Sequence, residues 1–171
     1  MSYSVAFVLR LTPCLVAVAG CQPPATLTGS FEAEPVAVTR FRADSVAYTT
    51  YSGINDSLHV VIRDLPRWRD YWGRIHSPFF PQPPAPAIDF RREMVILAAL
   101  GRRPSLGYDI LITSALRDSA GIEVFLVRSK PTQGCPVPAA ITEPVDLARI
   151  PASDLPVRFT ERITAIPCGA Q

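Results

Sequence analysis

Histidine and cysteine are the side chains best suited to catalysis or metal binding, and this chain has two histidines and four cysteines. A serine triad needs a histidine that an acid orients, yet neither His59 nor His76 lies near a Gly-x-Ser-x-Gly turn. Asp89 precedes an apolar run, where it suits a turn better than an acid or base. The sequence carries no phosphate loop and no metal-ligand spacing. We therefore expect no catalytic residue, no metal and no cofactor, and so a non-enzyme.

Cys21 has the clearest predicted role. Arg10 precedes an apolar run at 11–19. That run is too short to cross a bilayer, which takes about 20 residues, but it fits the core of a signal peptide. The stretch LVAVAGC at 15–21 resembles a bacterial lipobox, in which the cysteine becomes the acylated first residue. We expect a lipoprotein signal peptide over residues 1–20 and lipidation of Cys21; the alternative is an ordinary signal peptide that leaves Cys21 as a thiol.

This anchor determines the expected localisation. Gln22 follows Cys21, and a residue other than Asp at this position favours the outer membrane in bacteria that have one. Each buried methylene of an acyl chain contributes about 0.8 kcal/mol, so several chains hold firmly. We expect a protein of the bacterial cell envelope, held to the membrane by lipid at the outer membrane or the periplasmic face. Residues 21–34 then form a tether.

Cys135 and Cys168 remain after removal of the signal peptide and lipidation of Cys21. An even pair in an oxidising compartment predicts a disulfide. It would close a loop of roughly 30 residues and contribute about 3 to 4 kcal/mol in the chain-entropy model. Free thiols remain an alternative, as does a metal site, although the two cysteines are too far apart for a ligand pair.

The composition indicates one globular domain. The chain has 171 residues, of which 48% are hydrophobic and 19% charged. The formal net charge is +2, and the arginines are scattered among Asp and Glu, so we expect no nucleic-acid partner. Eighteen prolines divide the chain into short pieces and disfavour long helices.

Two apolar patterns occupy the middle of the chain. Residues 94–100 form an unbroken apolar run, which is typical of a strand buried on both faces. Residues 108–113 alternate, as in a strand with one face in the core. The turn residues at 101–107 predict that these two strands form a central antiparallel hairpin. Residues 144–150 predict another strand, and Pro144 and Pro151 suit an edge position.

One helix is predicted over residues 64–76. Asp64 suits the N-cap, and His76 at the end would, as a cation, interact favourably with the helix dipole. The apolar face consists of Trp68, Tyr71, Trp72 and Ile75. We expect this face to pack on a sheet rather than to bind a ligand. Residues 77–88 carry five prolines and predict an extended connector.

Together these patterns predict an α+β fold that is mostly β. We expect about eight short strands in an antiparallel twisted sheet or open barrel, with one packed helix. The sequence shows no repeat and no alternation of strands with helices. The predicted single domain spans residues 35–168.

From about residue 64 to residue 160 the chain resembles the PrcB C-terminal domain family. The resemblance is carried by the helix tryptophans, DF at 89–90, MVI at 94–96, GRRPSLGY at 101–108 and PVDLARIP at 144–151. Leu106 departs from the family, which often has glycine there, so the turn is expected to be less tight. The namesake of the family is a lipoprotein that associates with and stabilises a secreted serine-protease complex. The resemblance therefore implies a non-catalytic protein that binds or stabilises a partner protein, such as a protease or envelope complex.

The candidate binding surface is the loop at 102–108. It combines arginines, a proline-stiffened backbone and an aromatic ring, and Arg and Tyr are frequent at binding hot spots. The candidate residues are Arg102, Arg103, Pro104, Ser105 and Tyr108. An ordinary hairpin turn is the simpler alternative. The loop also has a faint similarity to a loop of chagasin-type cysteine-protease inhibitors, so inhibition is the alternative function, and a purely structural lipoprotein is a third possibility.

Overall fold

The computed structural model describes residues 33–41 and 50–169, which lie in a compact unit spanning Phe31–Gln171. Cys21, the predicted signal peptide and most of the predicted tether lie outside the described residues. The described residues form one helix, α2, and ten strands. Their bounds are β1 Glu34–Val36, β2 Thr39–Arg40, β3 Leu58–Ile62, α2 Leu65–Ile75, β4 Glu93–Ala99, β5 Arg103–Ser105, β6 Asp109–Arg117, β7 Ile122–Pro131, β8 Ala139–Thr142, β9 Val145–Pro151 and β10 Val157–Ile166.

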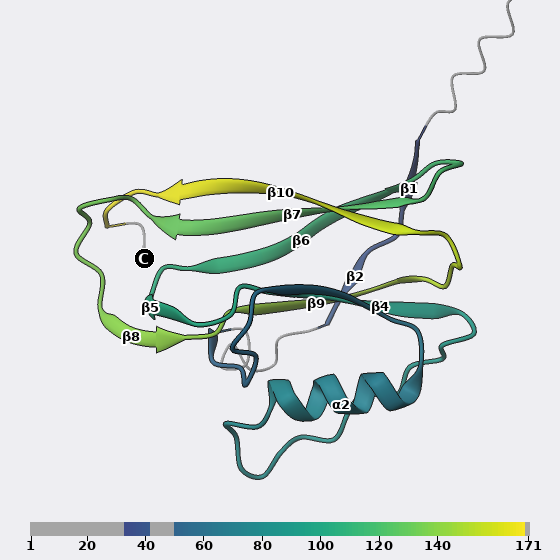
Figure 1. The fold of residues 1–171 in the computed structure, drawn as a ribbon, viewed down its shortest axis with the longest axis horizontal. Helices are drawn as coiled ribbons and strands as arrows, with labels where there is room; N and C mark the ends of the chain where they lie inside the picture. The colour runs from purple at the N-terminus through teal and green to yellow at the C-terminus, as the bar shows by residue number, and fades with distance from the viewer. Residues whose placement is uncertain (1–32, 42–49, 170–171) are drawn as a thin grey trace, which may run out of the picture. The chain divides into compact units, whose positions relative to one another are not determined.

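The strands form two four-stranded sheets and a small ribbon. Sheet A has the order β1-β6-β7-β10, sheet B has the order β2-β9-β4-β3, and β5 pairs with β8 in the ribbon. Figure 1 shows sheet A above sheet B, with α2 beneath sheet B. The α+β, mostly β class is confirmed. The single sheet or open barrel is replaced by two stacked sheets, because sheet B has apolar residues on both of its faces.

Strand β4 lies at the centre of the packing. Met94, Ile96 and Ala98 belong to the core between the two sheets. Val95, Leu97 and Ala99 point the other way, into the core between sheet B and α2. All six of these side chains are buried. The unbroken apolar run is thus explained by a strand that is covered on both faces.

The prediction that residues 94–100 and 108–113 form a central hairpin is wrong. Strand β4 pairs with β3 and β9, whereas β6 pairs with β1 and β7 in the other sheet. The chain between them changes layer, and its middle forms β5. Gly101 permits this exit with a φ of 72°, and a Cβ there would lie 2.6 Å from the carbonyl oxygen of Asn55. The connection therefore passes from sheet B to sheet A at one end of the domain, instead of turning back within one sheet.

Strand β9 is not an edge strand, contrary to the prediction. It pairs with β2 on one side and β4 on the other, and Leu147 and Ala148 are buried. The two prolines do not prevent this, because Pro144 precedes the strand and Pro151 is its last residue. The interior amides of the strand remain free to pair on both sides.

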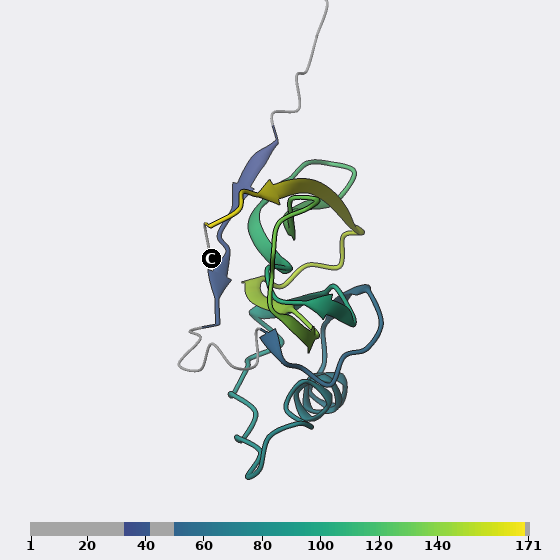
Figure 2. The ribbon, with the colours of Figure 1, turned by 90° about the vertical axis from the view of Figure 1, so that its left-hand side faces the viewer.

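The antiparallel order fails at one pair of strands. Strand β10 runs parallel to β7, with Val157 opposite Ile122 and Ile166 opposite Pro131. Parallel neighbours need a crossover, and here β8 and β9 supply it by passing through the ribbon and sheet B. The N-terminal strands also change layer, since β1 joins sheet A and β2 joins sheet B; Figure 2 shows this segment alongside both layers.

The predicted helix is confirmed. The Arg67 N–H donates to Asp64 Oδ1 at 2.8 Å, which caps the first turn. Trp68, Trp72 and Ile75 are buried against sheet B. The indole N–H groups of the two tryptophans donate to Pro86 O and Pro83 O, each at 2.9 Å. The helix thereby holds the proline-rich connector through its backbone carbonyls.

His76 does not end the helix as an exposed cation. It is buried, its ring centroid lies 4.1 Å from that of Trp72, and its Nδ1 lies 3.0 Å from Trp72 O. Burial lowers the pKa of His76 below its ordinary value of 6.5, and the hydrogen bond to Trp72 only partly offsets this. The expected favourable interaction of a cation with the helix dipole is overridden by desolvation.

Candidate protein-binding face

The loop at 102–108 is a strand-like connection rather than a hairpin turn. Its middle is β5, whose Arg103 and Ser105 lie opposite Thr142 and Ala139 of β8. Leu106 N–H donates to Pro138 O at 3.2 Å, and the Thr142 hydroxyl donates to Ser105 O, also at 3.2 Å. Figure 1 shows β5 and β8 together at one end of the two sheets. The segment around β8 therefore fixes the backbone of the loop.

The two loop arginines point to different surroundings. Arg102 donates to Asn55 Oδ1 at 3.0 Å, and its Nε lies 3.5 Å from Glu143 Oε1. Arg103 donates through Nη2 to Leu100 O at 2.6 Å, and its guanidinium carbon lies 6.0 Å from the centre of the Tyr108 ring. The structure thus separates Arg102 from the other candidate binding residues.

Arg103, Pro104 and Tyr108 line a cavity of about 210 Å³, which we call the loop cavity. Its other walls are residues that sequence reasoning did not select, namely Leu100, Arg128, Ser129, Lys130 and Ile163. Ser105 does not line it; its hydroxyl donates to Leu106 O at 3.1 Å. Three of the five predicted residues are therefore together, and Arg102 and Ser105 lie elsewhere.

The loop cavity is basic and has an apolar rim. Arg128 forms an ion pair with Glu161 at 2.9 Å, and His59 Nε2 lies 2.8 Å from the second oxygen of the same carboxylate. Within the described part of the chain, no carboxylate pairs with Arg103 or Lys130. Ile163 is 59% exposed and contributes apolar surface to the rim. The cavity thus offers two uncompensated positive charges beside apolar surface.

Sequence reasoning missed the walls contributed by β7 and β10 because they lie far from the loop in the chain. The pairing of β7 with β10 places Arg128 opposite Ile163. Lys130 is the only lysine in the sequence, but its position follows from that parallel pairing rather than from any local pattern. A correct prediction of the last strand's direction would have been needed to find these walls.

A second polar cluster lies between the sheets. Asp146 is buried, accepts a hydrogen bond from Arg40 at 2.9 Å and accepts another from Ile112 N–H at 2.7 Å. Burial raises the pKa of Asp146, and both hydrogen bonds oppose this. Burial also raises the pKa of nearby Asp109, to which the charge of Asp146 adds. Asp146 is buried and each of its two carboxylate oxygens accepts a hydrogen bond, whereas Asp109 is exposed and accepts from Ile110 N–H, so we regard this cluster as structural.

The predicted disulfide is present. Cys135 and Cys168 are bonded across a separation of 33 residues, with their Cα atoms 5.2 Å apart. The bond links the segment after β7 to the segment after β10. Neither sulfur is therefore a thiol nucleophile or a metal ligand in this state.

Asp89 fixes a turn, as the sequence suggested. Its carbonyl accepts from Arg92 N–H and Glu93 N–H, each at 2.9 Å, and its carboxylate accepts from Arg91 N–H at 3.1 Å. Among the described residues, no group of three or more His, Cys, Asp and Glu side chains is placed to hold a metal ion. In this part of the chain, no helix has the length and apolarity needed to cross a membrane.

These features define a two-layered, disulfide-linked β-rich domain with a basic cavity at one end. Residues 94–151, which run from β4 to the end of β9, match the family model described as PrcB C-terminal. The resemblance seen in the sequence is confirmed over this stretch, which contains the loop and most of the loop cavity. No curated protein and no solved structure matches the chain.

Proposed function

We propose that this protein is a non-enzymatic lipoprotein of the bacterial cell envelope that binds a partner protein at its loop cavity. The observation that carries the proposal is the composition of the cavity. Arg103 and Tyr108 from the loop meet Lys130 and the exposed Ile163 around one hollow. Arg and Tyr are enriched where protein interfaces gain most of their binding energy.

The charges of the cavity define the chemistry of the partner. Arg103 and Lys130 form no ion pair with a carboxylate among the described residues. An acidic side chain of the bound protein would form ion pairs with them. Tyr108 and Ile163 would pack against an apolar group next to that acid. The similarity to the PrcB C-terminal family supports a secreted protease complex as the first partner to test.

The disulfide and the packing of the histidines support a binding role over catalysis. Cys135 is bonded to Cys168, so it offers no thiolate nucleophile. His76 packs against Trp72, and His59 contacts Glu161. Each of these candidate catalytic groups thus has a structural contact.

The membrane anchor is tested first. Replacing Cys21 by Ala should move the protein from the membrane fraction to the soluble fraction, because the acylated thiol is lost. Mass spectrometry of the N-terminal peptide should find acyl groups in the wild-type protein. Membrane association that survives C21A, with no acyl mass on the wild-type peptide, would contradict the proposed anchor.

The binding face is tested by charge reversal at the cavity. We expect R103E and K130E each to weaken capture of a purified protease complex by at least about tenfold. R69E is the matched control, since Arg69 is an exposed arginine on α2, far from the cavity lining. A photo-crosslinker in place of Ile163 should label the partner directly. Equal capture by R103E, K130E and R69E would exclude the loop cavity as the binding face.

Protease inhibition is the alternative function. It is favoured by the position of the loop at one end of two stacked sheets, where the loop could be presented to a protease. The same purified protein is assayed against a papain-like protease. Sub-micromolar inhibition that R103E abolishes would replace the partner-binding proposal. Protection of a protease complex from loss of activity, without inhibition, would support it.

A further inference from the structure

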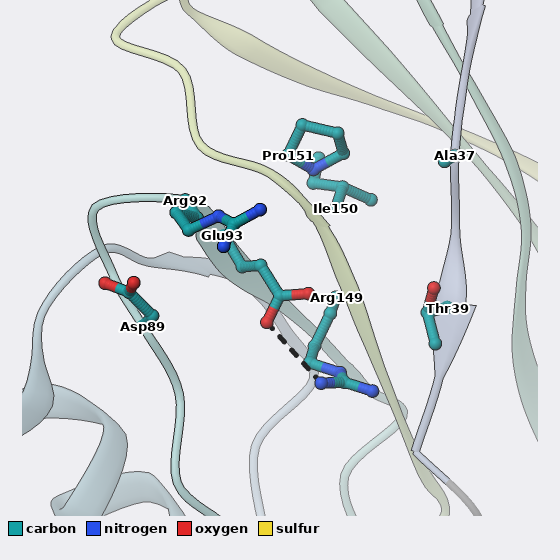
Figure 3. Close-up of a pocket in the computed structure, with 8 residues that line it drawn as sticks. All are labelled: Ala37, Thr39, Asp89, Arg92, Glu93, Arg149, Ile150 and Pro151. Carbon is teal, nitrogen blue, oxygen red and sulfur yellow. Dashed lines mark hydrogen bonds and ion pairs between the residues drawn. The ribbon is translucent and has the colours of Figure 1, made fainter.

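A second hollow lies away from the loop cavity and shares no residue with it. It has a volume of about 410 Å³, within the range of about 300 to 1,000 Å³ that is usual for small-molecule sites. Three segments form it: the link between β1 and β2, the turn before β4 and the end of β9. Its lining residues are Ala37, Thr39, Asp89, Arg92, Glu93, Arg149, Ile150 and Pro151, shown in Figure 3, and we call it the Arg92–Arg149 pocket.

Strand register brings the charged groups of this pocket together. Glu93 lies opposite Pro151, and Arg149 lies opposite Thr39. The Asp89 turn directs the chain into β4 and places Arg92 beside Glu93. In Figure 3 the side chain of Glu93 lies between the guanidinium groups of Arg92 and Arg149. The pocket thus rests on backbone elements of sheet B rather than on long loops.

The two arginines have more donors than the described protein groups satisfy. The contact from Arg149 Nη1 to Glu93 Oε2 measures 3.4 Å, which is long for a charge-assisted hydrogen bond. Arg149 Nε is buried and has no hydrogen-bond partner among the described groups. The guanidinium of Arg92 pairs with no carboxylate in the same part of the chain. Glu93 already occupies the space between the two guanidinium groups, so a ligand carboxylate would pair with the donors that the arginines expose to the pocket.

The charge balance of the pocket narrows the class of ligand. Arg92 and Arg149 contribute two positive charges, and Asp89 and Glu93 contribute two negative ones. A doubly charged anion such as phosphate would meet both carboxylates and be repelled. A ligand with its own carboxylate and ammonium would match both signs, and Ala37, Ile150 and Pro151 offer apolar surface to a short side chain.

We propose that the Arg92–Arg149 pocket binds a free amino acid or a similarly small zwitterion. The two arginines hold the carboxylate, while Glu93 and Asp89 accept hydrogen bonds from the ammonium. This pocket shares no residue with the loop cavity, so a failure of either proposal would leave the other unaffected.

The proposal is tested by calorimetric titration of the purified chain with the standard amino acids. We expect at least one to bind saturably, and its deaminated acid and decarboxylated amine to bind at least about tenfold more weakly, because each lacks one charge. Inorganic phosphate serves as the anion probe. Tighter binding of phosphate than of any amino acid, or no binding of any amino acid at millimolar concentration, would overturn the proposal.

Two variants locate the site. R149Q should abolish binding of the amino acid, and R69Q should leave it unchanged, because Arg69 is exposed on α2 and does not line the pocket. E93Q should weaken binding of the amino acid, because the ammonium loses its acceptor. It should strengthen binding of the deaminated acid, because a negative charge next to the ligand carboxylate is lost. This opposite response cannot arise from a general loss of folding. Unchanged affinity in R149Q, or parallel losses for both ligands in E93Q, would contradict the assignment.

Discussion

The carboxylate of Asp146 joins strands from both sheets. Asp146 lies on β9 of sheet B, Arg40 lies on β2 of the same sheet, and Ile112 lies on β6 of sheet A. The Ile112 amide adjoins an irregularity in the pairing of β6 with β7, between Ile112 and Ser114. A side chain from the opposite layer thus satisfies a buried donor next to a disturbed ladder.

Replacing Asp146 by Ala should lower the free energy of unfolding by about 2 to 3 kcal/mol, because the Ile112 N–H loses its acceptor and Arg40 its partner. Urea denaturation measures the loss. D154A is the control, since Asp154 is exposed and should change stability by less than about 0.5 kcal/mol. Equal stability of the two variants would show that the link between the sheets contributes nothing.

His76 gives the stability a pH dependence of known sign. Burial lowers its pKa in the folded state, so below the ordinary value of 6.5 the unfolded chain binds the proton more readily. The contribution of neutral His76 to the free energy of unfolding is fully present above pH 6.5. It is lost as the pH falls from 6.5 towards the folded-state pKa. We expect H76Q to flatten the fall in unfolding free energy between these values. Parallel pH profiles for H76Q and the wild-type protein would refute this assignment.

At the scale of elements, α2 acts as a clamp for the connector at 77–88. The indole N–H of Trp72 reaches Pro83 O, and that of Trp68 reaches Pro86 O. Prolines supply carbonyls but no amide hydrogens, so acceptors are the only backbone groups they can offer. Tryptophan, a donor with a large apolar body, is therefore well suited to this face of the helix.

W72F should destabilise the protein by about 1 to 2 kcal/mol, because the Pro83 carbonyl loses its donor and the smaller ring fills less space. Faster hydrogen exchange of amides in the connector should accompany the loss. Y71F serves as the control on the same helix, since Tyr71 is only partly buried. Unchanged exchange in W72F would mean that other contacts hold the connector.

Local patterns predicted the elements well but not their partners. The 94–100 run and the helical spacing at 64–76 are local, and both appear where expected. The pairing of β4 with β9 and of β7 with β10 is decided by burial across the whole domain, which the short turns did not reveal. For the same reason the loop half of the loop cavity was predicted, and the β7 and β10 half was not.

For the whole molecule, the disulfide closes the end that carries the last strand. Cys135 and Cys168 are 33 positions apart in the sequence, and the segment between them contains β8, β9 and β10. The chain-entropy model gives about 3 to 4 kcal/mol for a loop of this length. We expect the double variant C135S/C168S to lose about that much free energy of unfolding, which urea denaturation would show as a lower midpoint. A midpoint equal to that of the wild-type protein would show that the strands alone hold this end.

The alternation of the chain between layers has a consequence for the order of assembly. Sheet B is complete only at Pro151 and sheet A only at Ile166, and each sheet draws strands from both ends of the described chain. An emerging polypeptide therefore cannot finish either layer before nearly all of it is available. Sheet A must wait for the C-terminal strand β10, and sheet B must wait for β9 just before it.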